Sequence, residues 1–184
     1  MKKVLLLSAI ALVTLGIKAQ DDKSKRPSPP AKVSETTNSG TVITIDYSQP
    51  AVKGREVGKD IAPYGKVWRT GANGATTLTF ADEVTIGGTK IPAGKYGLLT
   101  IPDKASWTII ITKQLDVTSP AAYKQESDVV RVQATPVSVK GKAETFTMQF
   151  ANVKPTSIEL HMMWDQTDVA LPITTEVETK VMAQ

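Results

Sequence analysis

The sequence contains no cysteine among its 184 residues. This absence excludes disulfides, thiolate nucleophiles and cysteine-ligated metal centres. Histidine is almost absent as well, since His161 is the only one, so imidazole acid–base chemistry has a single position available. Stability must come from a packed core, and a hydrophobic content of 41% is enough to build one in a domain of this size.

The sequence also lacks an apolar run long enough to cross a bilayer, which takes roughly 20 residues. Its longest run, from Val4 to Ile17, follows two lysines, is interrupted by polar residues and ends in a polar segment. This order is typical of a secretory signal peptide. We expect residues 1–19 to be removed after Ala19, which predicts a periplasmic or secreted protein with no transmembrane segment in its mature form.

A strong charge of one sign is missing too. The whole chain has 22 basic and 18 acidic residues and a net charge of +4. Removal of residues 1–19 takes away three lysines and leaves a net charge of +1. A nearly neutral domain has no overall field that attracts nucleic acid, so we expect no nucleic-acid partner. Any electrostatic recognition must be local.

A charged and then proline-rich segment precedes the domain. Residues 20–33 have little to bury, so the first part is expected to be a flexible tether. The part from Arg26 to Pro30 has two open interpretations, because a proline-rich segment is pre-ordered and can also lie extended against the domain edge. Residues 34–184 are expected to form a single β domain.

The rest of the chain shows short alternating segments and no sustained helical period. Gly87 and Gly88 predict a two-residue hairpin turn, and residues 120–126 predict a short helical turn. Three consecutive isoleucines at residues 109–111 predict a central strand covered on both faces. Strands are predicted at residues 41–47, 84–86, 89–91, 95–101, 107–112, 129–134, 144–150, 158–164 and 169–173.

Roughly nine or ten short antiparallel strands indicate an all-β fold. We favour an antiparallel β-sandwich, jelly-roll-like, in which two packed sheets hide their apolar faces. A small β-barrel with an apolar interior is the alternative. Trp107 and Trp164 are expected in the core because of the area that each can bury. Trp68 falls in a short predicted strand whose alternation leaves its side undecided.

The segment from Pro63 to Thr77 is the densest in residues that recognise ligands. An arginine guanidinium binds a carboxylate or phosphate through two parallel hydrogen bonds, and backbone N–H groups beside Gly71 and Gly74 can add donors. An aromatic ring next to an arginine can also stack on a sugar or a flat ligand. We predict a site for a small anionic or sugar-like ligand made by Lys53, Arg55, Tyr64, Trp68, Arg69 and Asn73.

A structural interpretation of the same segment is also open. Arg69 can form a buried ion pair, Asn73 can cap a turn, and the glycines can simply allow tight turns. The spacing of Gly65, Gly71 and Gly74 matches neither a Walker loop nor a dinucleotide loop, which excludes nucleotide binding by that route.

His161 lies on the polar side of its predicted strand, so we expect an exposed histidine. A metal site shared with Glu159, two residues earlier, is geometrically open, but one histidine with carboxylates does not define a metal site, and we predict no metal and no cofactor. The carboxylates are scattered along the chain and single out no acid pair of the kind that glycosidases use.

Four motifs follow one another along the chain. They are Arg26-Pro-Ser-Pro-Pro-Ala31, Asp46-Tyr-Ser-Gln-Pro-Ala-Val-Lys-Gly-Arg55, Pro63-Tyr-Gly-Lys-Val-Trp-Arg-Thr-Gly-Ala-Asn73 and Ile91-Pro-Ala-Gly-Lys-Tyr-Gly-Leu-Leu-Thr-Ile-Pro102. Together they resemble the secreted bacterial family catalogued as domain of unknown function 2911 (DUF2911). The resemblance covers nearly all of the mature chain and implies an exported, mainly β domain of the bacterial envelope with no established activity.

The resemblance also points to particular positions. Gln49 stands where the family commonly has arginine and Gly74 where it commonly has glutamate, which indicates that this chain lacks a structural Arg–Glu pair there. The positions that match the family pattern are Arg26, Tyr47, Lys53, Gly54, Arg55, Tyr64, Trp68, Arg69, Thr70, Gly71, Asn73 and Thr76.

The leading functional hypothesis is a non-enzymatic envelope domain that binds a small anionic or glycan ligand, or a partner protein of the envelope. A carboxylate-dependent hydrolase is the first alternative. A structural or assembly role in the envelope is the second.

Overall fold

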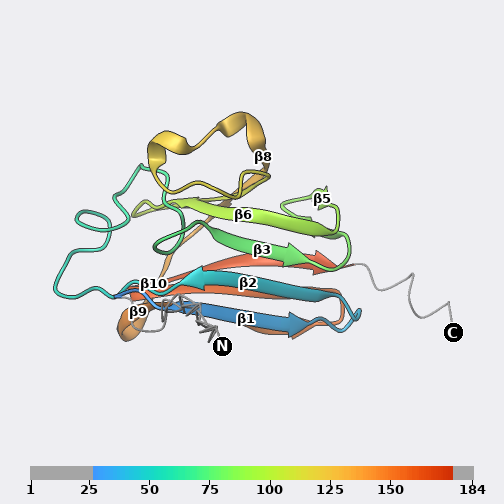
Figure 1. Cartoon of the computed structure of the whole chain (residues 1–184). Coiled ribbons are helices and arrows are strands. Elements are labelled where there is room, and N and C mark those ends of the chain that lie inside the picture. The colour runs from blue at the N-terminus through green and yellow to red at the C-terminus, as the bar shows by residue number, and fades with distance from the viewer. Residues whose placement is uncertain (1–26, 176–184) are drawn as a thin grey trace, which may run out of the picture.

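The computed structural model describes residues 27–175 and shows ten strands there in two antiparallel sheets (Figure 1). In spatial order the six-stranded sheet contains β1 (Pro30–Thr36), β2 (Val42–Ser48), β3 (Thr76–Phe80), β6 (Gly94–Ile101), β7 (Trp107–Thr112) and β8 (Asp128–Ala134). The four-stranded sheet contains β5 (Thr89–Ile91), β4 (Val84–Ile86), β10 (Ser157–Thr175) and β9 (Val137–Lys154). The sheets do not close into a barrel, so the predicted sandwich is confirmed and the barrel alternative is wrong.

The hydrophobic core lies between the two sheets. Alternate residues of β2 and β3 face it from one side, as Ile43 and Leu78 do, and Phe146 of β9 and Leu160 of β10 face it from the other. Each of these side chains is fully buried, which accounts for the alternating pattern of the sequence. The expected burial of Trp107 and Trp164 is confirmed, since their exposed fractions are 3% and 2%.

The β4–β5 hairpin is confirmed where the sequence predicted it. Gly87 and Gly88 have φ angles of 57° and 79°, and Ile86 pairs with Thr89 across the turn. Positive φ at both central residues suits the twist of a two-residue hairpin, and glycine reaches such angles without steric cost. The short helical turn is confirmed as two 3-10 turns, η2 (Pro120–Ala122) and η3 (Gln125–Ser127).

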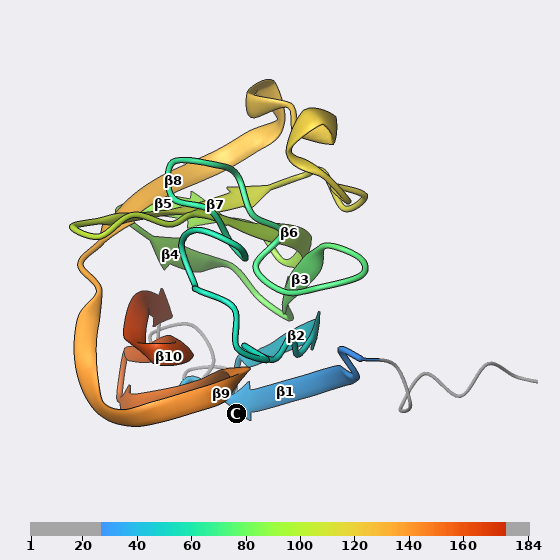
Figure 2. The ribbon, with the colours of Figure 1, turned by 90° about the vertical axis from the view of Figure 1, so that its left-hand side faces the viewer.

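The last two predicted strands are one bent strand, β10. The buried residues are even-numbered up to Trp164 and odd-numbered from Val169 onward. Asp165 has a φ angle of 52°, and the pairing of β10 with β9 slips on both sides of it. An irregularity of this kind bends the strand and breaks its alternation, so the residues after Asp165 face the core with the opposite parity. The sequence predicted two separate strands here, at residues 158–164 and 169–173, and this division is wrong. Figure 2 shows the curvature of β9 and β10.

The strand with three isoleucines is covered on both faces, as predicted, but it is not central. β7 lies next to the edge strand β8. Ile109 and Ile111 face the main core, whereas Ile110 packs with Leu99 and Val117 on the outer side of the sheet. A loop rather than a second sheet therefore covers that side.

The start of the domain lies ahead of the boundary that the sequence suggested at residue 34. β1 begins at Pro30, and the carbonyl oxygen of Pro29 accepts a hydrogen bond from the backbone N–H of Gln49 at 2.9 Å. Pro29 and Pro30 thus lie along the domain edge, next to β2. The predictions for residues 1–19 and 20–26 fall outside the described residues. Within residues 27–175, no helix is long and apolar enough to cross a membrane.

Two long loops of the six-stranded sheet meet each other. Residues 49–75 join β2 to β3 and project from one end of the sandwich, on the left in Figure 1. Residues 113–127 join β7 to β8 and carry both 3-10 turns. Val67 of the first loop and Val117 of the second belong to the same small apolar cluster, so the loops meet.

Candidate functional site

A cavity of about 360 Å³ lies between the two long loops and the bend of β10. Three cationic side chains line it, Arg55, Lys66 and Arg69, against one carboxylate, Asp60. Trp68 and Trp164 add aromatic surface, and Ser28 and Ser119 add hydroxyl groups. This combination of surplus positive charge with flat apolar surface suits an anionic ligand that also carries a ring.

The two arginines are held by backbone carbonyls. Arg55 donates from Nε to the oxygen of Val52 at 3.1 Å and from Nη2 to the oxygen of Ala51 at 2.7 Å. Arg69 donates from Nη1 to the oxygen of Asn73 at 2.7 Å. Carbonyl partners fix each guanidinium without neutralising its charge, and each has five N–H donors, so several remain for a ligand.

The cations of the cavity have no acidic partners in the described part of the chain. Residues 27–175 show no ion pair to Arg55, Lys66 or Arg69. The structural interpretation of Arg69 as one half of a buried ion pair therefore does not hold, because its partner is the carbonyl of Asn73. An anion that enters the cavity meets charge that the protein leaves uncompensated.

Asn73 makes long-range side-chain contacts that differ from the turn cap considered from the sequence. Its φ angle is 61°, and its Nδ2 donates to the carbonyl oxygen of Ser28 at 2.9 Å and to the hydroxyl of Ser48 at 3.2 Å. The side chain thereby ties the N-terminal segment to the loop. This bond holds Ser28 in the cavity wall.

The loop of residues 49–75 stores backbone strain. Four of the six non-glycine residues with positive φ within residues 27–175 lie in it: Lys53, Ala62, Thr70 and Asn73. A β-branched residue such as Thr70, at 54°, is an outlier there. Its hydroxyl donates to that of Thr100 at 3.1 Å, and its carbonyl accepts from the hydroxyl of Thr76 at 2.7 Å. Strain of this kind gathers at functional sites.

Trp68 is a fixed aromatic wall and not part of a strand. Its backbone makes an isolated bridge to Thr100, with hydrogen bonds of 2.7 and 2.9 Å, and its Nε1 donates to the carbonyl of Gly71 at 3.0 Å. The ring stacks on Trp164 with centroids 5.3 Å apart and meets Phe146 edge-on at 4.9 Å. The ring is half-buried, so part of it remains open to a ligand.

Trp164 has a polar group without a partner. Its indole Nε1 is buried and meets no acceptor among the described residues. An unsatisfied buried donor costs about 1–3 kcal/mol, and such groups often mark sites where a ligand or a water supplies the acceptor. Trp164 lines the cavity, but its Nε1 has almost no accessible surface, so a ligand in the cavity reaches this N–H only if the ring shifts.

The structure brings together half of the predicted site. Arg55, Trp68 and Arg69 line the cavity, whereas Lys53, Tyr64 and Asn73 do not. The backbone N–H of Lys53 donates to Glu144 Oε1 at 2.7 Å and its side chain is exposed. The ring of Tyr64 is 37% exposed and covers Gly58.

Sequence reasoning missed the opposite wall of the cavity. Val117, Ser119 and Pro120 come from the loop of residues 113–127, and Trp164 was expected only as a core residue. The sequence contained one indication of this wall, because three consecutive isoleucines predicted that β7 is covered on both faces. The sequence pattern of β7 did not indicate which segment of the chain covers its outer side.

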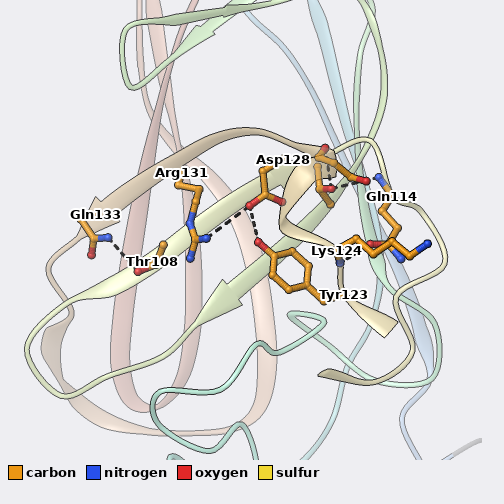
Figure 3. Close-up of polar contacts among 9 residues, drawn as sticks. Thr108, Gln114, Tyr123, Lys124, Asp128, Arg131 and Gln133 are labelled. Carbon is orange, nitrogen blue, oxygen red and sulfur yellow. Dashed lines mark hydrogen bonds and ion pairs between the residues drawn. The ribbon is translucent and has the colours of Figure 1, made fainter. Parts of the chain in front are cut away.

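Polar contacts hold this second loop in place (Figure 3). Gln114 donates from Nε2 to the carbonyl of Ala122 at 2.6 Å and accepts from the backbone N–H of Lys124 at 3.0 Å. The hydroxyl of Tyr123 donates to Asp128, and Arg131 Nη1 lies 3.7 Å from the same carboxylate. Burial raises the pKa of Asp128 against the opposing effects of Tyr123 and Arg131; burial and the bond to Asp128 raise the pKa of Tyr123 to about 12.

His161 lies outside the cavity and is not the exposed histidine that the sequence predicted. Its side chain is only 16% exposed and contacts Asp168 Oδ2 through Nδ1 at 2.8 Å and Glu159 Oε2 through Nε2 at 3.2 Å. Alternation missed Asp168 because the bulge at Asp165 reverses the facing of the residues after it. Residues 27–175 show no group of three or more acidic or histidine side chains arranged to hold a metal ion.

These features define a two-sheet all-β protein with a cation-lined cavity between its loops and the bend of one strand. The chain belongs to the family described as Protein of unknown function (DUF2911), whose profile matches residues 28–173. The resemblance of the four motifs to this family is thereby confirmed. Comparison with curated proteins gave no match, and comparison with solved structures gave none either.

Proposed function

We propose that this protein is a non-enzymatic binding module for a small anionic or sugar-like ligand, acting in the bacterial envelope. The observation that carries the proposal is the cavity lined by Arg55, Lys66, Arg69 and a single acidic residue, in which these three cations have no ion-pair partner within residues 27–175. The envelope location follows from the signal peptide that residues 1–19 predict.

The dimensions of the cavity favour a small molecule. Its volume of about 360 Å³ lies at the lower end of the range of small-molecule sites, roughly 300–1,000 Å³. A ligand with one ring and one anionic group fits this space, whereas a folded partner protein does not enter it. The anionic group is expected at Arg55 and Arg69 and the ring at Trp68.

Preorganisation supports the same conclusion. Because backbone carbonyls already fix both guanidinium groups, ligand binding orders few side chains and loses little entropy. Each hydrogen bond between a guanidinium and an anion contributes about 1.5–3 kcal/mol. Two such contacts give useful affinity even for a small ligand.

The hydrolase alternative has less in its favour. Glycoside hydrolysis uses two carboxyl groups on either side of the bond that is cleaved. Of the described residues that line the cavity, Asp60 alone carries a carboxylate, and its Oδ2 accepts the backbone N–H of Glu56 at 2.9 Å. The cavity supports binding better than hydrolysis, and no comparable feature favours an assembly role.

Thermal denaturation of the mature protein with matched probes tests the proposal. We expect phenyl phosphate or glucose 1-phosphate to raise the melting temperature and their uncharged counterparts, phenol and glucose, to have much less effect. At a hundred times the Kd the gain is about 2.7 kcal/mol, or roughly 5–10 °C. An equal response to charged and uncharged probes contradicts the anion site.

Two variants and one control locate the binding. Arg55→Gln and Arg69→Gln are each expected to weaken binding of the anionic probe by about 10- to 100-fold, since each removes a charged hydrogen bond. Lys104→Gln removes a cation from an exposed position outside the cavity and is expected to leave affinity unchanged. If the control loses as much affinity as the arginine variants, the binding is nonspecific and the proposed site is wrong.

A further inference from the structure

The contact between His161 and Asp168 spans the bend of β10. The two residues are seven positions apart on one strand, yet His161 Nδ1 lies 2.8 Å from Asp168 Oδ2. Seven residues of straight strand extend about 23 Å, so the strand must fold back between them. The side-chain contact therefore closes the bend.

The bulge at Asp165 makes this contact geometrically available. Residues of odd and even number face opposite sides of a regular strand, so His161 and Asp168 would normally point apart. The alternation of β10 reverses after Trp164, where Asp165 has a positive φ, and this reversal brings them to the same side. β9 follows the outside of the curve, because the interval from Met163 to Thr167 on β10 pairs with the longer interval from Thr147 to Ser138 on β9.

Trp164 lies inside this bend and couples it to the cavity. It is buried, stacks on Trp68 with ring planes 15° apart, and lines the cavity. The backbone between His161 and Asp168 determines where this ring lies. A change in the curvature of the bend must move Trp164 relative to Trp68, since packed aromatic rings have no free space to absorb it.

The charged and polar groups around His161 come from both strands of the hairpin. On β10, Asp168 and Glu159 contact its two nitrogens, and Asp165 pairs with Lys142 of β9 at 3.4 Å. On β9, Asn152 donates to Glu159 at 2.6 Å, and the charge of Lys154 lowers the pKa of Glu159. Gln149 of β9 lies opposite His161 in the strand pairing.

The protonation state of His161 decides whether its ring donates a hydrogen bond to both of the carboxylates that it contacts. The imidazolium ion has two N–H donors and a positive charge, so it can donate to Glu159 and Asp168 together. Neutral imidazole has one N–H, which leaves one carboxylate facing a nitrogen lone pair. Burial alone lowers the pKa of His161, but the hydrogen bonds and charges of Asp168 and Glu159 outweigh it and raise the pKa above 6.5.

We propose that His161 is a pH-dependent bridge across the β10 bend that sets the position of Trp164 in the cavity wall. We call His161, Glu159 and Asp168 together the histidine bridge. The cationic bridge holds the bend closed and Trp164 against Trp68, and loss of the proton loosens both. Any effect of this movement on ligand affinity rests on the proposed function, whereas the movement itself occurs without a ligand.

The sign of the pH effect follows from linkage. Because the folded protein binds the His161 proton more tightly than the unfolded chain, the bridge stabilises fully below about pH 6.5 and is lost as pH rises through the folded-state pKa. Between these two values the unfolding equilibrium constant rises by up to about tenfold per pH unit. The chain has one histidine and no cysteine, so no other side chain with an ordinary pKa titrates in this window.

Titration of the ligand-free mature protein tests the bridge. NMR follows the single imidazole, and near-ultraviolet circular dichroism follows the packed tryptophans over the same pH range. We expect one shared midpoint, above pH 6.5. A midpoint of His161 at or below 6.5, or a tryptophan signal that stays constant through the His161 titration, overturns the proposal. Neither result depends on whether phenyl phosphate or glucose 1-phosphate binds, so failure of this proposal is distinguishable from failure of the proposed function.

Matched variants of the bend identify the partner. Asp168→Asn is expected to lower the midpoint of both signals, because it removes the carboxylate that contacts Nδ1. Asp165→Asn removes a carboxylate from the same bend that pairs with Lys142 instead, and asparagine suits its positive φ. It is expected to shift the midpoint much less, and equal shifts in the two variants overturn the proposal. If Asp168→Asn does not fold, Glu159→Gln, at a more exposed position, is expected to lower the midpoint as well, and no shift there overturns the proposal.

Discussion

Replacement of Gly97 by alanine tests the wall of the cavity that the sequence did not reveal. Gly97 lies in β6 opposite Thr112, at the point where the loop of residues 113–127 crosses the strand. A Cβ atom on Gly97 would lie 2.4 Å from the carbonyl oxygen of Gln114 and 2.9 Å from Thr112 Cγ2. Neither neighbour is the end of a flexible side chain, so the backbone of the loop must move.

The expected cost is moderate. Ordinary contact needs a separation of at least 3.4 Å, so the loop must shift by about 1 Å at Gln114. Overpacking of this kind costs about 1–3 kcal/mol, and the lower entropy of the unfolded alanine variant offsets about 0.4–1 kcal/mol of it. A net loss of about 1–2 kcal/mol lowers the melting temperature by roughly 2–8 °C.

Urea denaturation of Gly97→Ala beside Gly74→Ala measures this effect. A Cβ atom on Gly74 meets nothing within 4 Å and the residue is exposed, so its alanine variant is expected to be as stable as the original protein or slightly more stable. The side chain of Gln114 is hydrogen-bonded to the backbone of Ala122 and Lys124. A shift of the loop at Gln114 is therefore expected to move the cavity wall as well and to weaken binding of phenyl phosphate. Equal stability of the two variants would show that residues 113–127 do not lie against β6, and the account of the cavity would fail.

Two further predictions concern the aromatic wall and the loop anchor. Trp68→Leu is expected to lower the free energy of unfolding by about 2–4 kcal/mol, because it removes the ring that packs on Trp164 and Phe146. Chemical denaturation measures this loss, and a loss below about 1 kcal/mol would refute the packing. Tyr123→Phe is expected to lower the free energy of unfolding by about 1–3 kcal/mol at neutral pH and to raise the pKa of Asp128 further, because the carboxylate loses its hydroxyl donor. NMR titration measures this pKa, and an unchanged value would contradict the contact.

Much of the fold could be predicted from the sequence because local periodicity determines it. The alternation around Ile43, Phe146 and Leu160 predicted which face of each strand is buried, and Gly87 with Gly88 predicted the hairpin. β10 shows where such reasoning fails. A turn and a bulge both reverse the alternation, and the sequence alone does not distinguish them when Asp165 adopts a positive φ inside a strand.

The candidate site was predictable only in part, because it depends on loop backbone and tertiary packing. Arg55, Trp68 and Arg69 reach the cavity, as composition suggested. Lys53 and Asn73 do not line it, and both have positive φ angles, which no sequence period predicts. The wall around Val117 comes from a distant loop that packs over β7, and nothing local to that loop indicates where it lies.

A crystal structure of the mature protein with phenyl phosphate tests the central claim most directly. The account predicts the phosphate within hydrogen-bond distance of Arg55 and Arg69 and the ring against Trp68, in the cavity of about 360 Å³. An empty cavity at a saturating concentration of phenyl phosphate, or a phosphate bound away from both arginines, would contradict it.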